Sequence, residues 1–425
     1  MYALLRQTQI YLNGVSGRRP RVPVDADRLE QAARRKLSGD AFAYIATGAG
    51  AERTVAANRA AFDRWRIVPR MLRDVEHRDT GVELFGRRLQ SPLMLAPIGV
   101  LELAHPEADA AVAQAARETG TPMILSNQAS RPMEEIAGIL GQTPHWFQLY
   151  WSKSDELVES LAGRAKACGC EAIVVTLDTT VLGWRTRDLE RAYVPFLRGK
   201  GIAQYTSDPV FNRLIAAPGP ASAPEQQPRP NLQALRTLIE LTRAYPGGFL
   251  ETLRSGRGRA AVQRFVEIYS RPSLRWEDLQ FLRERTDLPI LLKGILHPDD
   301  AARAVDSGID GIVVSNHGGR QVDGSIATLE ALPEVARAVG GRIPIVLDSG
   351  IRGGADIFKA LALGATAVLI GRPYVYGLAI AGRAGVREVI ENLHADFELT
   401  MALAGCSSIG EIGPEALVAG AGLPG

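Results

Sequence analysis

Eight short apolar runs, with helical patterns between most of them, constrain the fold of this chain more than any other feature. They are Leu93–Gly99, Pro122–Asn127, His145–Trp151, Ala172–Asp178, Pro289–Ile295, Gly311–His317, Pro344–Gly350 and Ala367–Pro373. Each run is continuous rather than alternating, which is typical of strands buried on both faces of a parallel sheet. Eight strand–helix units predict an α/β fold, a closed (β/α)8 TIM barrel whose functional residues gather at the carboxyl ends of the strands.

The rest of the chain is arranged around this barrel. We expect the barrel to span residues 91–400, after an N-terminal segment of residues 1–90 and before a C-terminal tail of residues 401–425. Sequence patterns in the N-terminal segment predict two helices and a hairpin, over Asp27–Leu37, Gly39–Ile45 and Gly81–Leu89. The hairpin would turn at Phe85 and Gly86 and is a candidate plug for the amino end of the barrel.

A long insertion, residues 179–288, separates the fourth and fifth apolar runs. A connection of this length in a compact domain is usually functional or disordered. We interpret Gly183–Ser207 as an ordered flap over the pocket and residues 216–259 as a mobile segment, because Ala216–Pro230 is rich in Pro, Ala and Gln. The insertion is therefore the predicted lid of the barrel.

Composition excludes several classes of function. The 425 residues include 49 basic and 47 acidic ones, so there is no excess of positive charge of the kind that binds nucleic acid or an anionic membrane. No stretch reaches the ~18 apolar residues of a membrane span, and polar residues interrupt the N-terminus where a signal peptide would be apolar. The three cysteines, Cys168, Cys170 and Cys406, make neither a disulfide framework nor a metal set. We predict a cytoplasmic protein with a small-molecule partner and no metal site.

The sixth apolar run ends in Ser-Asn-His-Gly-Gly-Arg-Gln, which places a base beside an anion clamp. His317 can take and return a proton near neutral pH, and Arg320 can hold a carboxylate with two parallel hydrogen bonds. The alternative is a histidine that caps a strand beside a solvated arginine. Asp178, at the end of the fourth run, is the natural partner for His317, although it could instead cap a helix.

The seventh and eighth runs end in glycine-rich turns that contain Arg352 and Arg372, where barrels of this class often bind a phosphate. Lys293 ends a buried strand, and its ammonium could stabilise negative charge on a reduced isoalloxazine ring. We therefore predict bound FMN. The predicted cofactor-binding residues are Pro97, Ile98, Gly99, Ser126, Gln148, Thr176, Lys293, Ser315, Asp348, Gly350, Arg352, Gly371 and Arg372.

Together these motifs resemble those of the FMN-dependent α-hydroxy acid oxidases and dehydrogenases. The resemblance rests on Phe-Gln-Leu-Tyr, Thr-Leu-Asp-Thr, Leu-Lys-Gly-Ile, Ser-Asn-His-Gly-Gly-Arg-Gln and Asp-Ser-Gly-Ile-Arg-Gly-Gly-Ala-Asp, in this order along the chain. Ala-Pro-Ile-Gly-Val at 96–100 and Leu-Gly-Trp-Arg at 182–185 are most similar to the lactate 2-monooxygenase branch. The resemblance implies the following catalytic residues: His317 as base, Asp178 as its partner, Arg320, Arg185 and Tyr44 on the substrate carboxylate, and Tyr150 near the hydroxyl.

The implied activity is oxidation of an L-2-hydroxy acid, lactate-like, to the 2-oxo acid or to its oxidative decarboxylation product. Molecular oxygen or another acceptor would reoxidise the flavin, and the resemblance also implies a homo-oligomer, a tetramer or larger. Three alternatives stay open: a membrane-linked or other-acceptor dehydrogenase of mandelate-like acids, a different FMN barrel enzyme such as an isomerase, and a binding module without turnover. The residues leave the preferred acid open.

Overall fold

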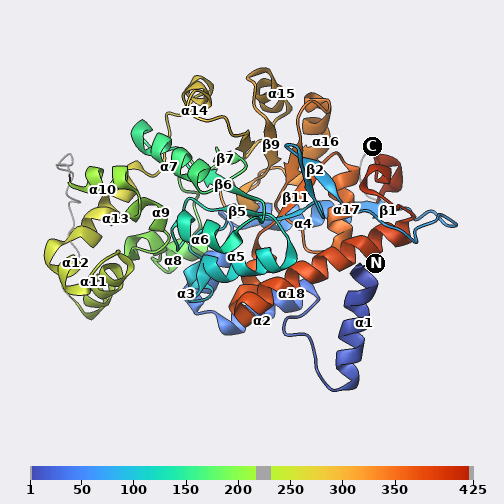
Figure 1. Ribbon diagram of the computed structural model, residues 1–425, viewed down its shortest axis with the longest axis horizontal. Coiled ribbons are helices and arrows are strands. Elements are labelled where there is room, and N and C mark those ends of the chain that lie inside the picture. The colour runs from blue at the N-terminus through green and yellow to red at the C-terminus, as the bar shows by residue number, and fades with distance from the viewer. Residues whose placement is uncertain (1, 217–230, 421–425) are drawn as a thin grey trace.

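The computed structural model describes residues 2–216 and 231–420 of the chain (Figure 1). Its central strands are β4 (Leu93–Leu95), β5 (Met123–Leu125), β6 (His145–Leu149), β7 (Ile173–Thr176), β8 (Ile290–Lys293), β9 (Gly311–Val314), β10 (Ile345–Leu347) and β11 (Ala367–Ile370). They pair in parallel in this order, and β11 pairs with β4, so the predicted closed barrel is confirmed. Each strand stops before its apolar run does, because the last residues of each run form the loops at the carboxyl end.

Burial on both faces explains why the runs are apolar throughout. Side chains alternate along a strand, so one set points into the barrel and the other points outward. Met94, Trp146 and Leu291 belong to the inner core, whereas Phe147 and Ile173 pack in the larger core with the surrounding helices. Neither face is left for solvent, as expected for an all-parallel barrel.

Eight helices cover the outside of the barrel. They are α5 (Ala108–Thr119), α6 (Met133–Leu140), α7 (Asp155–Ala167), α14 (Leu279–Arg283), α15 (Pro298–Asp306), α16 (Thr328–Val339), α17 (Gly354–Ala362) and α18 (Arg372–Ala404). Local sequence sets their ends: the Ser154 side chain accepts a hydrogen bond from the Leu157 N–H and starts α7. The long helix α18 changes direction at Ala381 and Gly382, where the backbone is not helical.

The N-terminal segment forms α1 (Tyr2–Val15), α2 (Ala26–Lys36), α3 (Gly39–Ala46), α4 (Arg53–Asp63) and β1 (Trp65–Ile67), which pairs with β12 (Leu417–Ala419). The predicted hairpin is present as β2 (Val82–Leu84) and β3 (Arg87–Leu89). Phe85 and Gly86 turn with φ of 50° and 73°, the left-handed conformation that a two-residue hairpin turn favours. The Phe85 ring lies 5.6 Å from that of Trp146, so the hairpin packs against the inner core of the barrel.

The insertion is largely helical and lies at the left of the barrel in Figure 1. It contains α8 (Thr186–Glu190), the short 3-10 helix η2 (Pro195–Arg198), α9 (Ala203–Thr206), α10 (Pro209–Ala216), α11 (Leu232–Ala244), α12 (Phe249–Ser255) and α13 (Arg257–Ile268). The predicted flap is therefore ordered. The predicted mobile segment needs correction: its residues 217–230 lie outside the described ones, but residues 231–259 are mostly helical. The spacing of Leu232, Leu235, Leu238 and Leu241 is helical, and the composition of the segment does not reveal this spacing.

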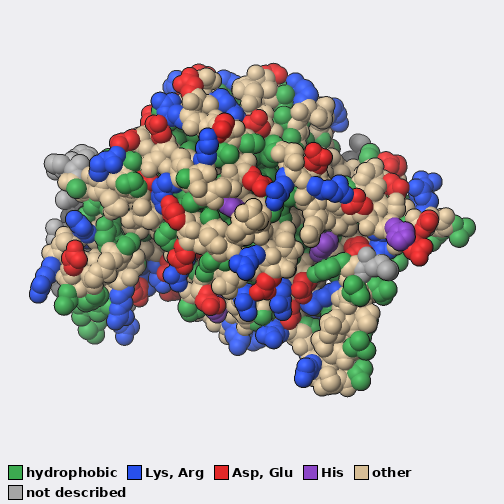
Figure 2. Space-filling model, in the orientation of Figure 1, with side chains coloured by type: hydrophobic (Ala, Val, Ile, Leu, Met, Phe, Trp, Pro, Cys, Tyr) green, Lys and Arg blue, Asp and Glu red, His purple; other side chains and the backbone are tan. Residues whose placement is uncertain are grey.

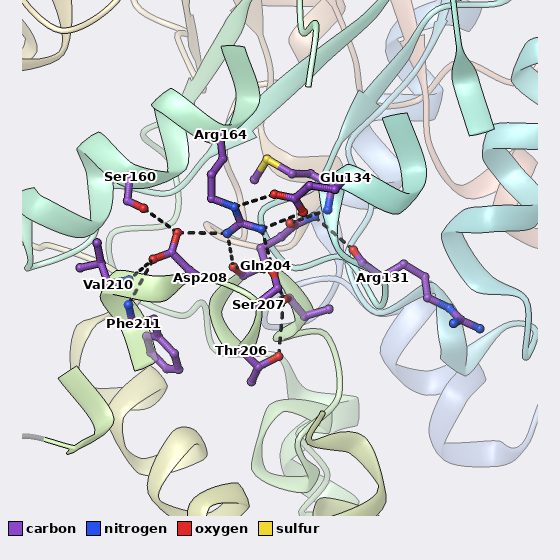
Figure 3. Close-up of polar contacts among 12 residues, drawn as sticks. Arg131, Glu134, Ser160, Arg164, Gln204, Thr206, Ser207, Asp208, Val210 and Phe211 are labelled. Atoms are coloured by element: carbon purple, nitrogen blue, oxygen red, sulfur yellow. Dashed lines mark hydrogen bonds and ion pairs between the residues drawn. The ribbon is translucent and has the colours of Figure 1, made fainter. Parts of the chain in front are cut away.

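Arg164 on α7 holds the insertion against the barrel, as Figure 3 shows. Its guanidinium lies 3.0 Å from the Asp208 carboxylate and 2.8 Å from that of Glu134. It also donates to the Gln204 carbonyl and the Ser207 hydroxyl, both at 2.8 Å. Asp208 in turn accepts from backbone N–H groups in the first turn of α10. We call these five residues the anchor, because they join α6 and α7 to α9 and α10.

The surface carries no large field of one charge on the face shown in Figure 2, where acidic and basic side chains are interspersed. This agrees with the near balance of charge in the sequence. Within residues 2–216 and 231–420, no helix has the length and apolarity needed to span a membrane.

Candidate active site

A cavity of about 350 Å³ lies at the carboxyl ends of the barrel strands. The loops after the strands, Tyr44 of helix α3 and the insertion all contribute to its walls. A concave pocket at this end of a barrel is the expected place for chemistry. The polar side chains inside it decide which chemistry is possible.

His317 follows β9 and is held by Asp178, which follows β7. The imidazole Nδ1 lies 2.8 Å from the Asp178 carboxylate and 3.2 Å from the Thr179 hydroxyl. The carboxylate therefore favours the tautomer with the proton on Nδ1, so that Nε2 carries the lone pair. Among the described residues, Nε2 has no hydrogen-bond partner, and His317 lines the cavity. This geometry suits a general base.

The ionic states around His317 follow from one buried cluster. Lys293 Nζ lies 3.6 Å from Asp178, 3.5 Å from Asp348 and 2.8 Å from the Ser315 hydroxyl. Burial opposes charge on Asp178, but Lys293 and His317 hold the pKa of this carboxyl well below its usual range. Burial likewise opposes charge on Lys293, but the two carboxylates raise the pKa of its ammonium. Lys293 is therefore charged at neutral pH, as is Asp178.

Burial lowers the pKa of His317 below its ordinary value, and Lys293 acts in the same direction. The Asp178 carboxylate opposes this shift without reversing it. A lowered pKa leaves the imidazole neutral at pH 7, which is the state that can accept a proton.

Two guanidinium groups face the same cavity, those of the buried Arg185 and the half-buried Arg320. Arg320 donates to the backbone carbonyls of Tyr44 and Thr47, and its guanidinium lies 5.1 Å from the centre of the Tyr44 ring. Burial and then Arg185 lower the pKa of Arg320 to about 9. No carboxylate among the described residues forms an ion pair with Arg320 or Arg185. Asp188 interacts with both guanidiniums only at longer range, so their charge is partly compensated and the pair is suited to an anionic ligand.

Tyr150 completes this polar side of the cavity. Its backbone N–H donates to the Asn127 side chain, which holds the loop after β6. Burial raises the pKa of Tyr150 to about 12, so its hydroxyl stays protonated and can donate a hydrogen bond to a substrate oxygen.

The opposite side of the cavity presents buried polar atoms that lack partners. Gln148 Nε2 and Thr176 Oγ1 have no hydrogen bond within the described part of the chain, and both residues line the cavity. The Gln148 carbonyl oxygen accepts from the Asn127 N–H at 3.1 Å, so its amide nitrogen is the free end. Native proteins rarely leave such atoms unsatisfied, and a flat heterocycle with carbonyls and ring nitrogens would satisfy them. These residues fit the flavin ring of FMN.

Two further arginines mark a phosphate site. Arg372 begins α18 and donates to the Gly318 and Thr47 carbonyls at 3.0 and 2.9 Å. Burial and then Arg372 lower the pKa of Arg352 to about 10. A Cβ on Gly350, whose φ is 107°, would lie 2.6 Å from the Asn58 carbonyl oxygen, so the loop depends on glycine there. Two half-buried cations beside a helix N-terminus fit the phosphate of FMN.

The structure brings nearly all predicted site residues to this cavity. Tyr44, Tyr150, Arg185, His317 and Arg320 line it, as do eleven of the thirteen predicted cofactor residues. Those eleven are Pro97, Ile98, Gly99, Gln148, Thr176, Lys293, Asp348, Gly350, Arg352, Gly371 and Arg372. Asp178 lies behind His317.

Ser126 and Ser315, the other two predicted cofactor residues, do not line the cavity and stay predictions. The Ser126 hydroxyl accepts from the Gln128 N–H, and the Ser315 hydroxyl bonds Lys293 and the His317 N–H. Both therefore support the site from behind. Strand alternation gives the side of a residue but not its depth in the barrel.

Sequence reasoning predicted that the insertion covers the pocket, but it did not identify the apolar residues of the insertion that line the cavity. These lining residues are Leu182, Val194, Phe196, Leu197, Phe265, Val266 and Tyr269. A rule based on strand ends cannot find them, because they lie far from any strand. The helical period of Arg257–Ile268 was the available signal, but it indicates a buried face and not a pocket.

A barrel with a histidine–carboxylate pair, a buried lysine and two anion sites defines a flavin-dependent oxidoreductase of small organic acids. Residues 33–419 match the FMN-dependent dehydrogenase family. The chain belongs to this family, so the predicted cofactor, FMN, is confirmed.

Similarity to individual relatives indicates the class of substrate. The chain is 40% identical over 400 residues to an L-lactate oxidase of Lysinibacillus sphaericus, covering 94% of each chain. It is 40% identical to a 4-hydroxymandelate oxidase of Amycolatopsis orientalis, covering 90% of this chain and 94% of that one. A crystal structure of mandelate oxidase superimposes with a TM-score of 0.75 and 37% identity, covering 95% of this chain and all of that one. The protein is an FMN-dependent enzyme that oxidises α-hydroxy acids.

Proposed function

We propose that the enzyme oxidises L-2-hydroxy acids, of which lactate is a simple example, with His317 as the base. One observation carries the proposal: an imidazole paired with Asp178 faces the same cavity as the guanidiniums of Arg185 and Arg320, neither of which forms an ion pair with a described carboxylate. A 2-hydroxy acid supplies both missing groups, a carboxylate for the arginines and a proton for the base.

Each side chain then has a defined task. Arg320 and Arg185 bind the carboxylate with Tyr44 and fix the orientation of the α-carbon. His317 Nε2 takes a proton from the substrate, and Asp178 stabilises the imidazolium that results. FMN, when bound, accepts the two electrons that leave the α-carbon. The protonated Tyr150 donates to the substrate oxygen.

Gln148 and Thr176 would hold the flavin ring, and Arg352 and Arg372 its phosphate. Lys293 would lie on the same side as Gln148 and Thr176, since Thr176 pairs with Lys293 in register across β7 and β8. Its positive charge, held by two carboxylates, suits a ring that gains negative charge on reduction.

The fate of the product distinguishes two branches of this chemistry. With oxygen as acceptor, a 2-oxo acid that leaves early is released together with hydrogen peroxide. A 2-oxo acid that stays beside the peroxide loses CO₂ and yields water and a carboxylic acid one carbon shorter. We propose oxygen as the acceptor and a homo-oligomer, a tetramer or larger, on the family resemblance. A cytoplasmic location is proposed from the cysteine content and the polar residues near the N-terminus.

Anaerobic mixing tests the proposal. The purified holoenzyme is mixed with L- and D-2-hydroxy acids while the visible absorbance of the flavin is followed, and air is then admitted to identify the carbon product. We expect bleaching by the L-acids. A flavin that keeps its colour with every acid would overturn the proposed reaction. Light scattering of the same sample measures the subunit number.

A further inference from the structure

The insertion contributes an apolar wall to the cavity, which we call the roof. It consists of Leu182, Val194, Phe196, Leu197, Phe265, Val266 and Tyr269. None of these side chains is charged at neutral pH. The bound carboxylate, the base and the flavin contacts described above use none of them, so the roof faces the remaining part of a substrate.

Aromatic contacts connect the roof to the residues that bind the carboxylate. The ring of Phe196 lies edge-on to that of Tyr44, with centroids 6.5 Å apart. Phe265 lies 5.3 Å from Phe196 and 5.1 Å from Tyr269. Tyr44 also faces the Arg320 guanidinium. A ligand whose carboxylate is held by Arg320 therefore has these rings beside its side chain.

The roof has a buried interior and an exposed edge. Phe265 and Phe196 are only 1% and 8% exposed, whereas Leu197 and Val266 are 55% and 48% exposed. Large aliphatic side chains at the edge of a cavity gain when an apolar group covers them, because apolar surface leaves water. A methyl group is too small to cover both the aromatic interior and this edge.

Packing contacts join the roof to the barrel. Phe265 packs edge-on against Tyr205 of α9 at 4.9 Å. The anchor fixes α9 and α10 to the barrel through Arg164 and Asp208 (Figure 3). A wall that is already ordered loses little conformational freedom on binding, so apolar contact with it converts efficiently into affinity.

We propose that the roof is a subsite for the substrate side chain, and that the enzyme prefers 2-hydroxy acids with an uncharged, apolar side chain much larger than methyl. Linear aliphatic and aryl side chains belong to this class. The inference rests on the proposed function, which orients the carboxylate. Each buried methylene contributes ~0.8 kcal/mol, which corresponds to about a fourfold change in affinity.

Simple carboxylates without a hydroxyl group test the subsite without turnover. Acetate, butanoate, hexanoate and octanoate are measured as competitive inhibitors of the holoenzyme. We expect the inhibition constant to fall about fourfold for each added methylene until the roof is covered. A constant that stays level or rises with chain length would overturn the proposal.

A substitution at the edge of the roof tests which residues form it. Val266→Trp should fill the subsite and lower the ratio of kcat/KM for L-2-hydroxyoctanoate to that for L-lactate by about tenfold or more. Leu253→Trp is the matched control, because Leu253 lies in α12, is 42% exposed and does not line the cavity. Leu197→Trp serves the same test if Val266→Trp does not fold. An unchanged ratio in the folded variants would show that the roof does not bind the substrate side chain.

The outcomes separate this inference from the function on which it rests. Failure of every 2-hydroxy acid to reduce the flavin overturns the proposed function. Reduction by L-lactate with a higher kcat/KM than by L-2-hydroxyoctanoate and L-mandelate overturns the subsite alone. Preference for a charged side chain, as in L-malate, also overturns the subsite alone.

Discussion

Two buried ionic clusters differ in how completely their hydrogen bonds are satisfied. In the anchor, the Asp208 carboxylate accepts hydrogen bonds from Arg164, Ser160 and backbone N–H groups. No side-chain polar atom of the five anchor residues is buried without a partner. At the barrel mouth, Gln148 Nε2 and Thr176 Oγ1 are buried without one. Both clusters are desolvated, so burial alone does not distinguish them.

The difference separates a structural cluster from a functional one. A fully satisfied network favours the folded state and has no capacity for a ligand. A network with unsatisfied atoms and partly compensated cations gains by binding a cofactor or substrate. Substitutions in the two clusters should therefore affect different measurements, stability for the anchor and flavin reduction for the site.

The largest expected effect is at the base. His317→Ala should slow flavin reduction by L-2-hydroxy acids by about 10²- to 10⁴-fold, the usual contribution of a general base. Stopped-flow absorbance under anaerobic conditions measures this rate. The variant should keep its flavin, since His317 is not among the proposed FMN contacts. Unchanged reduction kinetics would show that His317 is not the base. The barrel mouth would then no longer differ from the anchor in its effect on flavin reduction.

The anchor should respond in stability instead. Arg164→Met leaves the buried Asp208 carboxylate without its cation, which should lower the free energy of unfolding by about 3 kcal/mol. Arg213→Met is the matched control, because the Arg213–Glu156 pair also involves the insertion but is exposed, and exposed pairs contribute ~0–1 kcal/mol. Urea denaturation measures both. Equal losses in the two variants would show that burial of the anchor has no special importance.

A smaller effect is expected at the carboxylate clamp. Arg320→Lys keeps the charge but loses the planar fork, so kcat/KM for the acid should fall about tenfold. The loss should be greater in KM than in the reduction rate at saturation, because binding and alignment of the carboxylate are affected first. Steady-state kinetics with one L-acid makes this comparison. An unchanged KM in this variant would show that the substrate carboxylate does not bind to Arg320.

The smallest effect concerns pH. The pKa of His317 is lowered, so its neutral form persists to a pH below the ordinary value of ~6.5. Activity that needs the neutral base is therefore present above the lowered pKa and is lost as pH falls through it. We expect kcat/KM to change less than about twofold between pH 8 and 6.5. An acid limb centred above pH 6.5 would contradict the lowered pKa.

Much of the barrel and its mouth could be predicted because both follow from local rules. Continuous apolar runs identify the strands, and alternation places Gln148 with Tyr150 and Thr176 with Asp178 on common sides. Tyr44 lies on a helix far from the strands in sequence, and only the family resemblance indicates it. Ser126 and Ser315 do not line the cavity, and their hydroxyls bond neighbouring residues of the site instead.

The insertion could not be predicted in the same way. Its Pro, Ala and Gln content conceals a helical period, and no local pattern states which face of α13 turns toward the barrel. Phe265 lies near Tyr44 only because Phe196 packs between them and the anchor holds α9 in place. These are contacts between segments that are distant in the chain.

The sequence by itself determined the barrel and the choice of flavin, and it predicted the base and the arginines, because regular strands bring residues of matching periodicity to one end. Only the tertiary structure decided the depth of each side chain, the unsatisfied atoms of Gln148 and Thr176, and the apolar wall above the arginines. Depth and hydrogen-bond satisfaction depend on packing between distant segments, and no pattern along the chain encodes that packing locally.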